Sequence, residues 1–175
     1  MSTVDLTAEF PGLADKTFLD AACVSLTPHR ARRAIGQFLD MAVMCSASDA
    51  SAHHIEMDMM RGEPIRQAAR LLGALPANIA LVESTTHGLN IAANALPLQR
   101  GDNVLIADTE FLQVAIPWEK KRETLGIEIV PVRSENGRLD VGHFEAAMNA
   151  RTKVVCVSSV QWCSGNRLDM RALGE

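Results

Sequence analysis

The chain has 175 residues, and 47% of them are hydrophobic, which is enough to bury the core of one or two domains. Seventeen basic residues stand against twenty-one acidic ones, and the net charge of −4 leaves no basic surface for nucleic acid or for an anionic membrane. No apolar run is long enough for a bilayer, and the N-terminus MSTVDLTAEF lacks the features of a signal peptide. We therefore expect a cytoplasmic protein with small-molecule or protein partners.

Metal sites and disulfides are not indicated by the cysteines and histidines. The four cysteines are widely spaced and form no C-x-x-C pair. His53 and His54 are adjacent, and on a helix their side chains would point about 100° apart. We therefore expect reduced thiols and no metal site.

The first part of the chain predicts helices. Thr27 and Pro28 have the pattern of an N-cap followed by proline in the first helical turn. Apolar residues then follow at the spacing of an amphipathic helix: Ala31, Ala34, Ile35, Phe38, Leu39 and Ala42. The small, polar stretch SASDASAHH predicts a connection, and a second helix is expected from Pro64 to Leu72, ending at Gly73.

Beyond Gly73, short apolar runs alternate with helical patterns. Strands are expected at Ile79–Val82, Val104–Ala107, Ile127–Val130 and Val154–Val160. Helices are expected at Thr86–Ala95, Leu112–Leu125 and, with Asp140 as N-cap, Val141–Asn149. The alternation predicts an α/β fold of three layers, in which helices cover both faces of a mainly parallel sheet. Asp169 begins another helical pattern near the last residue, so we expect the natural protein to continue beyond it.

The segment Glu83–Gly88 lies between an expected strand and an expected helix, and it is the best local candidate for a binding site. The first amides of a helix have no internal partner, and the helix dipole adds partial positive charge. Thr85 and Thr86 add hydroxyl donors, and these groups together suit a phosphate. In the alternative interpretation, Ser84 or Thr85 only caps the helix.

Other kinds of site find less support. The chain has neither G-x-x-x-x-G-K-[ST] nor G-x-G-x-x-G between a strand and a helix, so a nucleotide is not indicated. It has no G-x-S-x-G motif, and nothing nearby in the sequence assigns a base to Cys163, which argues against a serine or cysteine nucleophile.

A series of motifs extends in order over nearly the whole chain. It consists of Phe18-Leu19-Asp20-Ala21-Ala22, Ser84-Thr85-Thr86-His87-Gly88-Leu89-Asn90, Gly101-Asp102-Asn103-Val104-Leu105, Asp108-Thr109-Glu110-Phe111 and Pro117-Trp118. In order and spacing it resembles the class V aminotransferases, which include cysteine desulfurases, kynureninases and isopenicillin epimerase-like enzymes. These are fold type I enzymes that depend on pyridoxal 5′-phosphate (PLP). Two departures are Ala21, where asparagine is usual, and His87, where glutamate is usual.

The resemblance implies a set of cofactor-binding residues. Thr85, Thr86 and the amides around them, including that of His87, would hold the cofactor phosphate. Phe111 stands where the family places the residue that stacks on the pyridine ring, as in the epimerase-like and kynureninase-like branches, whereas typical desulfurases have histidine there. An aromatic face can hold a flat, electron-poor ring by offset stacking. The alternative role of Phe111 is packing in the core.

The last motif, Val157–Gly165, resembles the strand end that brings polar groups near the cofactor's phenolic oxygen. Gln161 is the candidate for this contact. Many family members place asparagine one position later, where this chain has Trp162.

The resemblance also implies how the chain is organised. Residues 1–60 would form an N-terminal helical segment, comprising part of the small domain and a linker helix, and residues 61–175 would form an incomplete PLP-binding large domain. In the family, further strands lie between those present here. The lysine that forms the Schiff base and the carboxylate that keeps the pyridine nitrogen protonated lie downstream, so no catalytic residue is assigned. The chain's own lysines have surroundings typical of solvated charges: Lys16, Lys120, Lys121 and Lys153.

We therefore expect the full-length protein to be a PLP enzyme that acts on a small amino acid, by transamination or by C–S or C–N bond chemistry, and to form a homodimer. The chain alone is expected to be inactive. Two alternatives stay open: part of a cysteine desulfurase or C–S lyase, and a non-catalytic remnant that binds phosphate or serves dimerisation.

Overall fold

The computed structural model describes residues 6–21, 24–45 and 48–175. The chain divides into two compact units, Met1–Leu81 and Val82–Glu175. A compact unit is not by itself a functional domain. The domain boundary predicted between residues 60 and 61 therefore stays a prediction.

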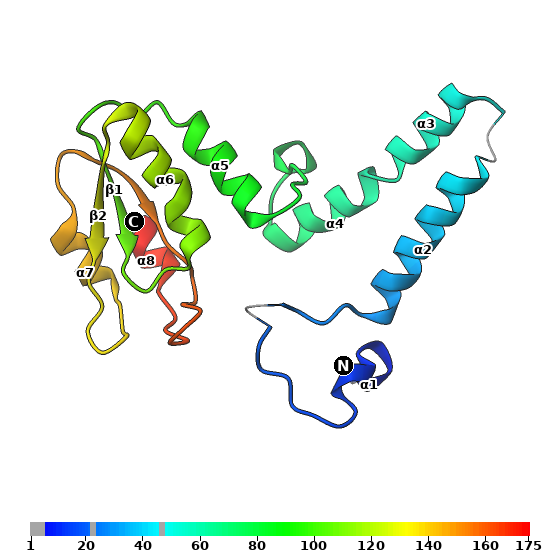
Figure 1. The fold of residues 1–175 in the computed structure, drawn as a ribbon, viewed down its shortest axis with the longest axis horizontal. Helices are drawn as coiled ribbons and strands as arrows, with labels where there is room; N and C mark the ends of the chain where they lie inside the picture. Colours follow the sequence, from blue (N-terminus) through cyan, green and yellow to red (C-terminus); the bar gives the residue numbers. More distant parts are fainter. Residues whose placement is uncertain (1–5, 22–23, 46–47) are drawn as a thin grey trace. The chain divides into compact units, whose positions relative to one another are not determined.

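The first unit consists of helices and connections (Figure 1). Its elements are α1 (Leu6–Glu9), η1 (Pro11–Leu13), α2 (His29–Met44), α3 (Ala50–Met59), α4 (Gly62–Leu72) and η2 (Pro76–Asn78). The two predicted helices are present as α2 and α4, and α4 ends at Gly73 as expected. The predicted cap of α2 is wrong, because Pro28 and not Thr27 is the N-cap residue and no side chain caps the helix. Gly73 has a left-handed φ of 63°, a conformation that costs glycine nothing because it has no Cβ.

The expected connection at SASDASAHH is wrong from Ala50 onward, because α3 begins there. The side chain of Asp49 accepts a hydrogen bond from the amide of Ala52 at 2.8 Å and caps the helix. Alanine is the best helix former, so the two alanines of this first turn extend the cap into a helix. Residues 46 and 47 of the expected connection lie outside the described residues.

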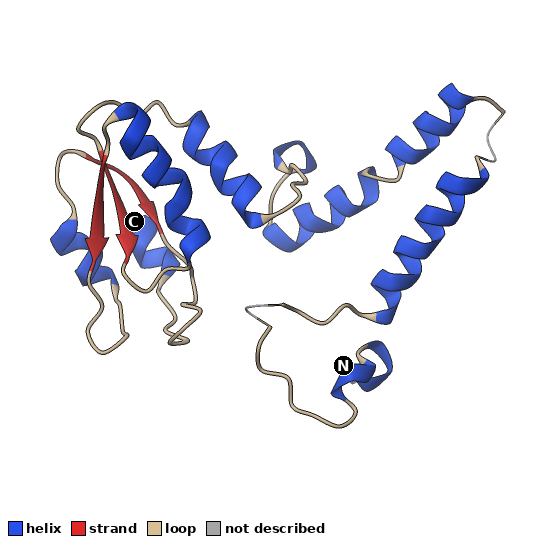
Figure 2. Cartoon of the chain, viewed as in Figure 1, coloured by secondary structure: helices blue, strands red, loops and turns tan. Residues whose placement is uncertain are grey.

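The second unit is an α/β layer structure (Figure 2). Its elements are α5 (Thr85–Ala95), β1 (Asn103–Ala107), α6 (Leu112–Leu125), β2 (Glu128–Val132), α7 (Val141–Ala147), β3 (Thr152–Cys156) and α8 (Met170–Gly174). The three strands form one sheet in the order β2-β1-β3, and both pairings are parallel.

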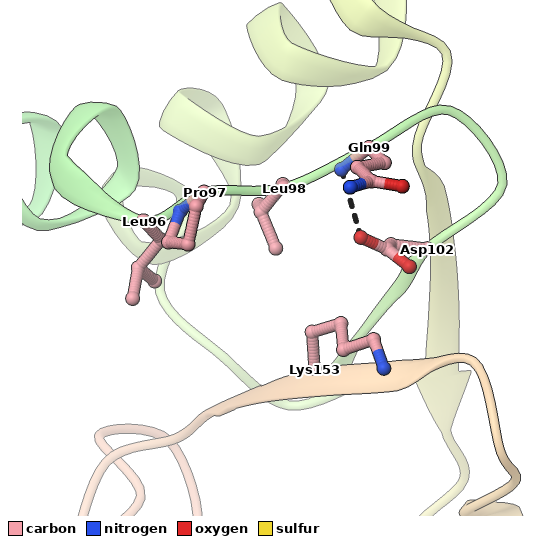
Figure 3. Close-up of a pocket in the computed structure, with 6 residues that line it drawn as sticks. All are labelled: Leu96, Pro97, Leu98, Gln99, Asp102 and Lys153. Carbon is pink, nitrogen blue, oxygen red and sulfur yellow. Dashed lines mark hydrogen bonds between the residues drawn. The ribbon is translucent and has the colours of Figure 1, made fainter.

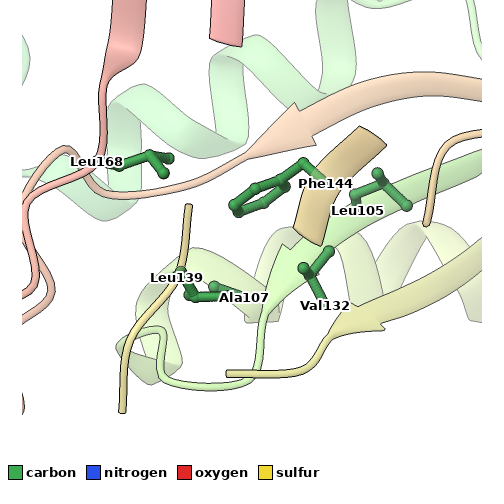
Figure 4. Close-up of a cluster of buried hydrophobic side chains, with 6 residues drawn as sticks. All are labelled: Leu105, Ala107, Val132, Leu139, Phe144 and Leu168. Carbon is green, nitrogen blue, oxygen red and sulfur yellow. The ribbon is translucent and has the colours of Figure 1, made fainter. Parts of the chain in front are cut away.

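Alternate residues of the central strand β1 face two separate cores. Val104 and Ile106 are buried on one face, with Ala93 of α5, Trp118 of α6 and Ile127. Leu105 and Ala107 are buried on the other, with Val132, Leu139, Phe144 of α7 and Leu168 (Figure 4). Helices therefore cover both faces, which explains why the β1 sequence has no polar alternation. The predicted three-layer α/β fold with a parallel sheet is confirmed.

The strand expected at Ile79–Val82 is wrong. Ile79 is extended, with φ −108° and ψ 125°, but within the described residues no strand pairs with this segment. Leu81 and Val82 are 48% and 42% exposed. A strand is completed by the backbone of a neighbour, so a favourable sequence without a partner stays an extended loop.

Two other elements end earlier than expected. β3 stops at Cys156 instead of Val160, because the amide of Ser158 donates to the Glu110 side chain instead of to a strand. Helix α7 stops at Ala147 instead of Asn149. The Asn149 side chain accepts from the amide of Arg151 at 2.9 Å, which forms a turn into β3.

Candidate functional site

The carboxyl ends of parallel strands are where α/β proteins bind ligands, and here the ends of β1 and β3 lie side by side. The segment after β1 carries Asp108, Thr109, Glu110 and Phe111. The segment after β3 begins at Val157 and includes Gln161 and Trp162. Two of the predicted residues, Phe111 and Gln161, are thus brought to one edge of the sheet.

Hydrogen bonds to Glu110 join these two segments. Its carboxylate accepts from the amide of Ser158, from the Ser158 hydroxyl at 2.8 Å and from Gln161 Nε2 at 2.7 Å. It also accepts a longer bond, 3.3 Å, from the amide of Phe111. The carboxylate therefore connects the loop after β1 to the loop after β3.

Gln161 is 2% exposed, and its side-chain amide is bonded within the protein. Nε2 donates to Glu110 and, at 3.5 Å, to the carbonyl oxygen of Ser158, while Oε1 accepts from the Thr109 hydroxyl at 2.9 Å. Buried amides are stable only when so bonded. These bonds show that Gln161 holds the two loops together; the predicted contact with the cofactor's phenolic oxygen stays a prediction.

Phe111 is 42% exposed and precedes α6 as its N-cap residue, with φ −70° and ψ 143°. It is not among the buried residues of either core cluster. Its ring makes an edge-to-face contact with Trp162, with ring centroids 5.3 Å apart and planes at 79°. Trp162 is 56% exposed, so the two aromatics form a partly open apolar surface beside the Glu110 carboxylate.

The start of α5 combines the two interpretations of the Glu83–Gly88 segment. Ser84 is the N-cap, and its Oγ accepts from the amide of His87 at 3.1 Å. Among the described residues, the amides of Thr85 and Thr86 have no hydrogen-bond partner. Ser84 therefore caps the helix, and the amides of Thr85 and Thr86 remain free to donate to an anion.

Helix α5 packs against α6, and Figure 1 shows it running roughly opposite to the strands. Its N-terminal turn therefore lies towards the carboxyl ends of the strands. No hydrogen bond joins Thr85, Thr86 or His87 to Phe111 or Gln161 in the described part of the chain. The structure thus links Phe111 and Gln161 through Glu110, and places the α5 turn towards the same end of the sheet.

Lys120 and Lys153 lie away from this edge. Lys120 is exposed and pairs with Glu123 at 3.1 Å on the surface of α6. Lys153 is the second residue of β3, at the amino ends of the strands, and lines a hollow of about 400 Å³ with Asp102 and Gln99 (Figure 3). The rise of about 3.3 Å per strand residue separates Lys153 from the carboxyl ends by most of the sheet.

The described residues contain no group of three His, Cys, Asp or Glu side chains arranged to hold a metal ion. His54 instead lies 3.7 Å from Asp58, one turn along α3. Cys156 is half-buried at the end of β3, and burial raises the pKa of its thiol. The Glu110 charge raises that pKa further, and the indole of Trp118 opposes the shift. No helix of the described segments is long and apolar enough to cross a bilayer.

A comparison with models of known protein families identifies the family of the chain. The model of the aminotransferase class V family matches residues 17–175. The chain belongs to this family. The predicted resemblance is therefore confirmed, and the match includes every residue of the candidate site.

Curated relatives are similar over nearly the whole chain. A probable cysteine desulfurase of Methanothermobacter thermautotrophicus is 26% identical over 99% of this chain and 44% of its own length. A cysteine desulfurase of Pectobacterium atrosepticum is 26% identical over 95% of this chain and also 44% of its own length. The chain thus spans less than half the length of these relatives.

Solved structures share the fold. The cystine C–S lyase C-DES in complex with its reaction product cysteine persulfide has a TM-score of 0.86 at 20% identity, covering 94% of this chain and 44% of the other. A C-DES mutant with glycine covalently linked to the PLP cofactor has a TM-score of 0.87 at 19% identity, covering 96% and 44%.

The sequence reasoning did not identify the roles of Glu110, Ser158 and Thr109. Glu110 and Thr109 stood in a motif only as neighbours of Phe111. One signal was available, because polar residues directly follow the apolar runs of two strands that pair in parallel. Such residues meet at one edge of the sheet.

Proposed function

We propose that this chain is the N-terminal part of a PLP-dependent enzyme that acts on an amino acid, and that its second unit supplies phosphate-binding and ring-binding groups. One observation carries the proposal. The free helix-start amides of Thr85 and Thr86 and the exposed ring of Phe111 lie in one unit, towards the carboxyl ends of its strands. Family membership and the PLP named for a C-DES structure support this cofactor.

The start of α5 fits a phosphate group. The amides of Thr85 and Thr86 donate to phosphate oxygens, the Thr86 hydroxyl adds a third donor, and the helix dipole favours the negative charge. Gly88 leaves room, since a Cβ there would meet only Val82 at 3.6 Å. His87 contributes its amide in our proposal, with Ser84 as the competing acceptor for the same N–H.

Phe111 fits a flat ring. In the proposal, its exposed face stacks on the pyridine, Trp162 limits how far the ring can tilt, and Gln161 keeps both loops in place. When bound, PLP supplies an electron sink for bond changes at the α-carbon of the substrate. Phe111 has no proton to transfer, so proton transfer requires other groups.

The lysine that holds the cofactor lies outside these 175 residues in our proposal. This is supported by the surface position of Lys120 and by the position of Lys153 at the opposite ends of the strands. The coverage of 44% of the relatives leaves room for it. We also propose a cytoplasmic location and, on the basis of the family resemblance, a homodimer as the full-length form.

Cysteine desulfurase or C–S lyase activity is the second candidate. It is favoured by the names of the curated relatives and of C-DES. Sulfide release from cysteine or cystine under reducing conditions would separate it from transfer of an amino group to a keto acid. A non-catalytic remnant is the third candidate and predicts neither reaction.

The experiment that tests the proposal is a titration of the full-length protein with PLP, followed by the visible absorption of the bound cofactor. We expect saturable binding with a spectrum distinct from that of free PLP. Phosphate binding without any spectral change would favour the non-catalytic remnant and overturn the enzyme proposal.

A further inference from the structure

The segment between β1 and Phe111 is attached to both neighbouring strand ends. The Asp108 side chain accepts from the amide of Ser134, just after β2, at 3.0 Å, and lies 3.8 Å from the Arg133 guanidinium. Glu110, two residues later, binds the loop after β3. The peptide that leads into Phe111 is therefore fixed on both sides, which is unusual for a loop at a strand end.

We propose that Glu110 is a positioning residue for the aromatic surface formed by Phe111 and Trp162. The inference deepens the proposed function and rests on it, because this surface is the part that would meet the cofactor ring. Glu110 binds Ser158 and Gln161, and Gln161 directly precedes Trp162. One carboxylate thus fixes the chain next to both aromatic residues.

A fixed aromatic pair binds a ring more tightly than a mobile one, because less conformational entropy is lost on binding. Phe111 and Trp162 are both partly exposed, so packing alone holds them loosely. The rigid support comes from Gln161, which is buried and bonded to both Glu110 and Thr109. The cluster consists of Thr109, Glu110, Ser158 and Gln161.

Every partner of Glu110 is a donor: the amides of Ser158 and Phe111, the Gln161 side-chain amide and the Ser158 hydroxyl. A carboxylate accepts from all of them at once. In Glu110→Gln, an NH₂ group replaces one carboxylate oxygen. This new donor then faces groups that are themselves donors and leaves a hydrogen bond unmade. The backbone amides of Ser158 and Phe111 cannot accept from that group, whereas the Ser158 hydroxyl can reverse its role without moving any other side chain, so Ser158 largely determines how well this variant is tolerated.

Four variants of the full-length protein test the inference: Glu110→Ala, Glu110→Gln, Ser158→Ala and the double variant Glu110→Gln/Ser158→Ala. Glu145→Gln is the matched control, since Glu145 is exposed on α7 and its side chain makes no hydrogen bond or ion pair in the described residues. The affinity for PLP is one measurement. The second is iodide quenching of tryptophan fluorescence in the cofactor-free protein.

These 175 residues contain two tryptophans, and the part of the quenching that a Trp162→Phe variant abolishes belongs to Trp162. Trp162 is 56% exposed, while Trp118 is 2% exposed and reports on the core. In Glu110→Ala we expect Trp162 to become more accessible to iodide and the Trp118 emission to stay unchanged. PLP affinity should fall about tenfold, because the mobile aromatic pair must then be ordered on binding.

Glu110→Gln should stay within about threefold of the wild type in PLP affinity, and adding Ser158→Ala should lower it to the level of Glu110→Ala. The inference is overturned if Glu110→Ala behaves like Glu145→Gln, or if Ser158→Ala has the same effect with and without Glu110→Gln. If Glu110→Ala does not fold, the Glu110→Gln pair alone decides. If the wild type does not bind PLP, the proposed function fails, and iodide quenching still decides whether Glu110 positions Trp162.

Discussion

Replacing Thr86 with valine separates phosphate binding from helix capping at the start of α5. Thr86→Val removes the hydroxyl donor but keeps the shape of the side chain and nearly the same helix propensity. Ser84→Ala removes the cap, whose Oγ accepts from the amide of His87 at 3.1 Å, and leaves that amide free. Thr86→Val should therefore mainly weaken binding, and Ser84→Ala should mainly lower stability.

The magnitudes follow from the hydrogen bonds involved. A bond to a charged phosphate contributes about 1.5–3 kcal/mol, so Thr86→Val should weaken PLP binding by about 10- to 150-fold with little change in unfolding free energy. Loss of the Ser84 cap should lower the unfolding free energy by about 1 kcal/mol. Ser84→Ala should change PLP affinity less than about threefold, because the His87 amide no longer donates to Ser84 and becomes free to donate to the phosphate.

PLP titration and urea unfolding, followed by the emission of the buried Trp118, measure both effects on the same samples. The wild type and Glu145→Gln serve as references. The reasoning is refuted if Thr86→Val binds PLP as well as the wild type, or if Ser84→Ala weakens binding without lowering stability. The first result would mean that the α5 turn is only a capped helix start, and the second that Ser84 contributes to binding and not to helix stability.

Two further predictions concern the core and the thiols of the second unit. Phe144 is fully buried against Leu105 and Val132, so Phe144→Ala should lower the unfolding free energy by about 3–5 kcal/mol; a loss under about 1 kcal/mol in urea unfolding would contradict this packing. At pH 8, mass spectrometry after alkylation should show Cys163 modified well before Cys156, because burial raises the pKa of Cys156 and keeps it a thiol; equal rates would exclude this. Because the pKa of the Cys156 thiol is raised on folding, its contribution to stability is fully present below the unfolded-state pKa and is lost as the pH rises through the folded-state pKa. Cys156 should therefore lower the unfolding free energy only in alkaline solution.

The sequence by itself determined the features that depend on neighbouring residues. Asp140 and Ser84 were recognisable as caps or cap candidates, and each accepts from an amide three residues later. Helix α6 has the predicted limits, Leu112 to Leu125. The ordered motifs also identified the family, because they preserve local turns and strand ends that the sequence shows directly.

Only the tertiary structure decided the features that need a partner from elsewhere in the chain. Ile79–Val82 has a strand sequence but remains a loop, because no described strand supplies its hydrogen bonds. The role of Gln161 depends on Glu110 and Thr109, more than fifty residues earlier in sequence, and no local pattern contains that contact. Caps and turns are encoded within a few residues, whereas strand pairing and buried polar clusters form only when distant segments meet.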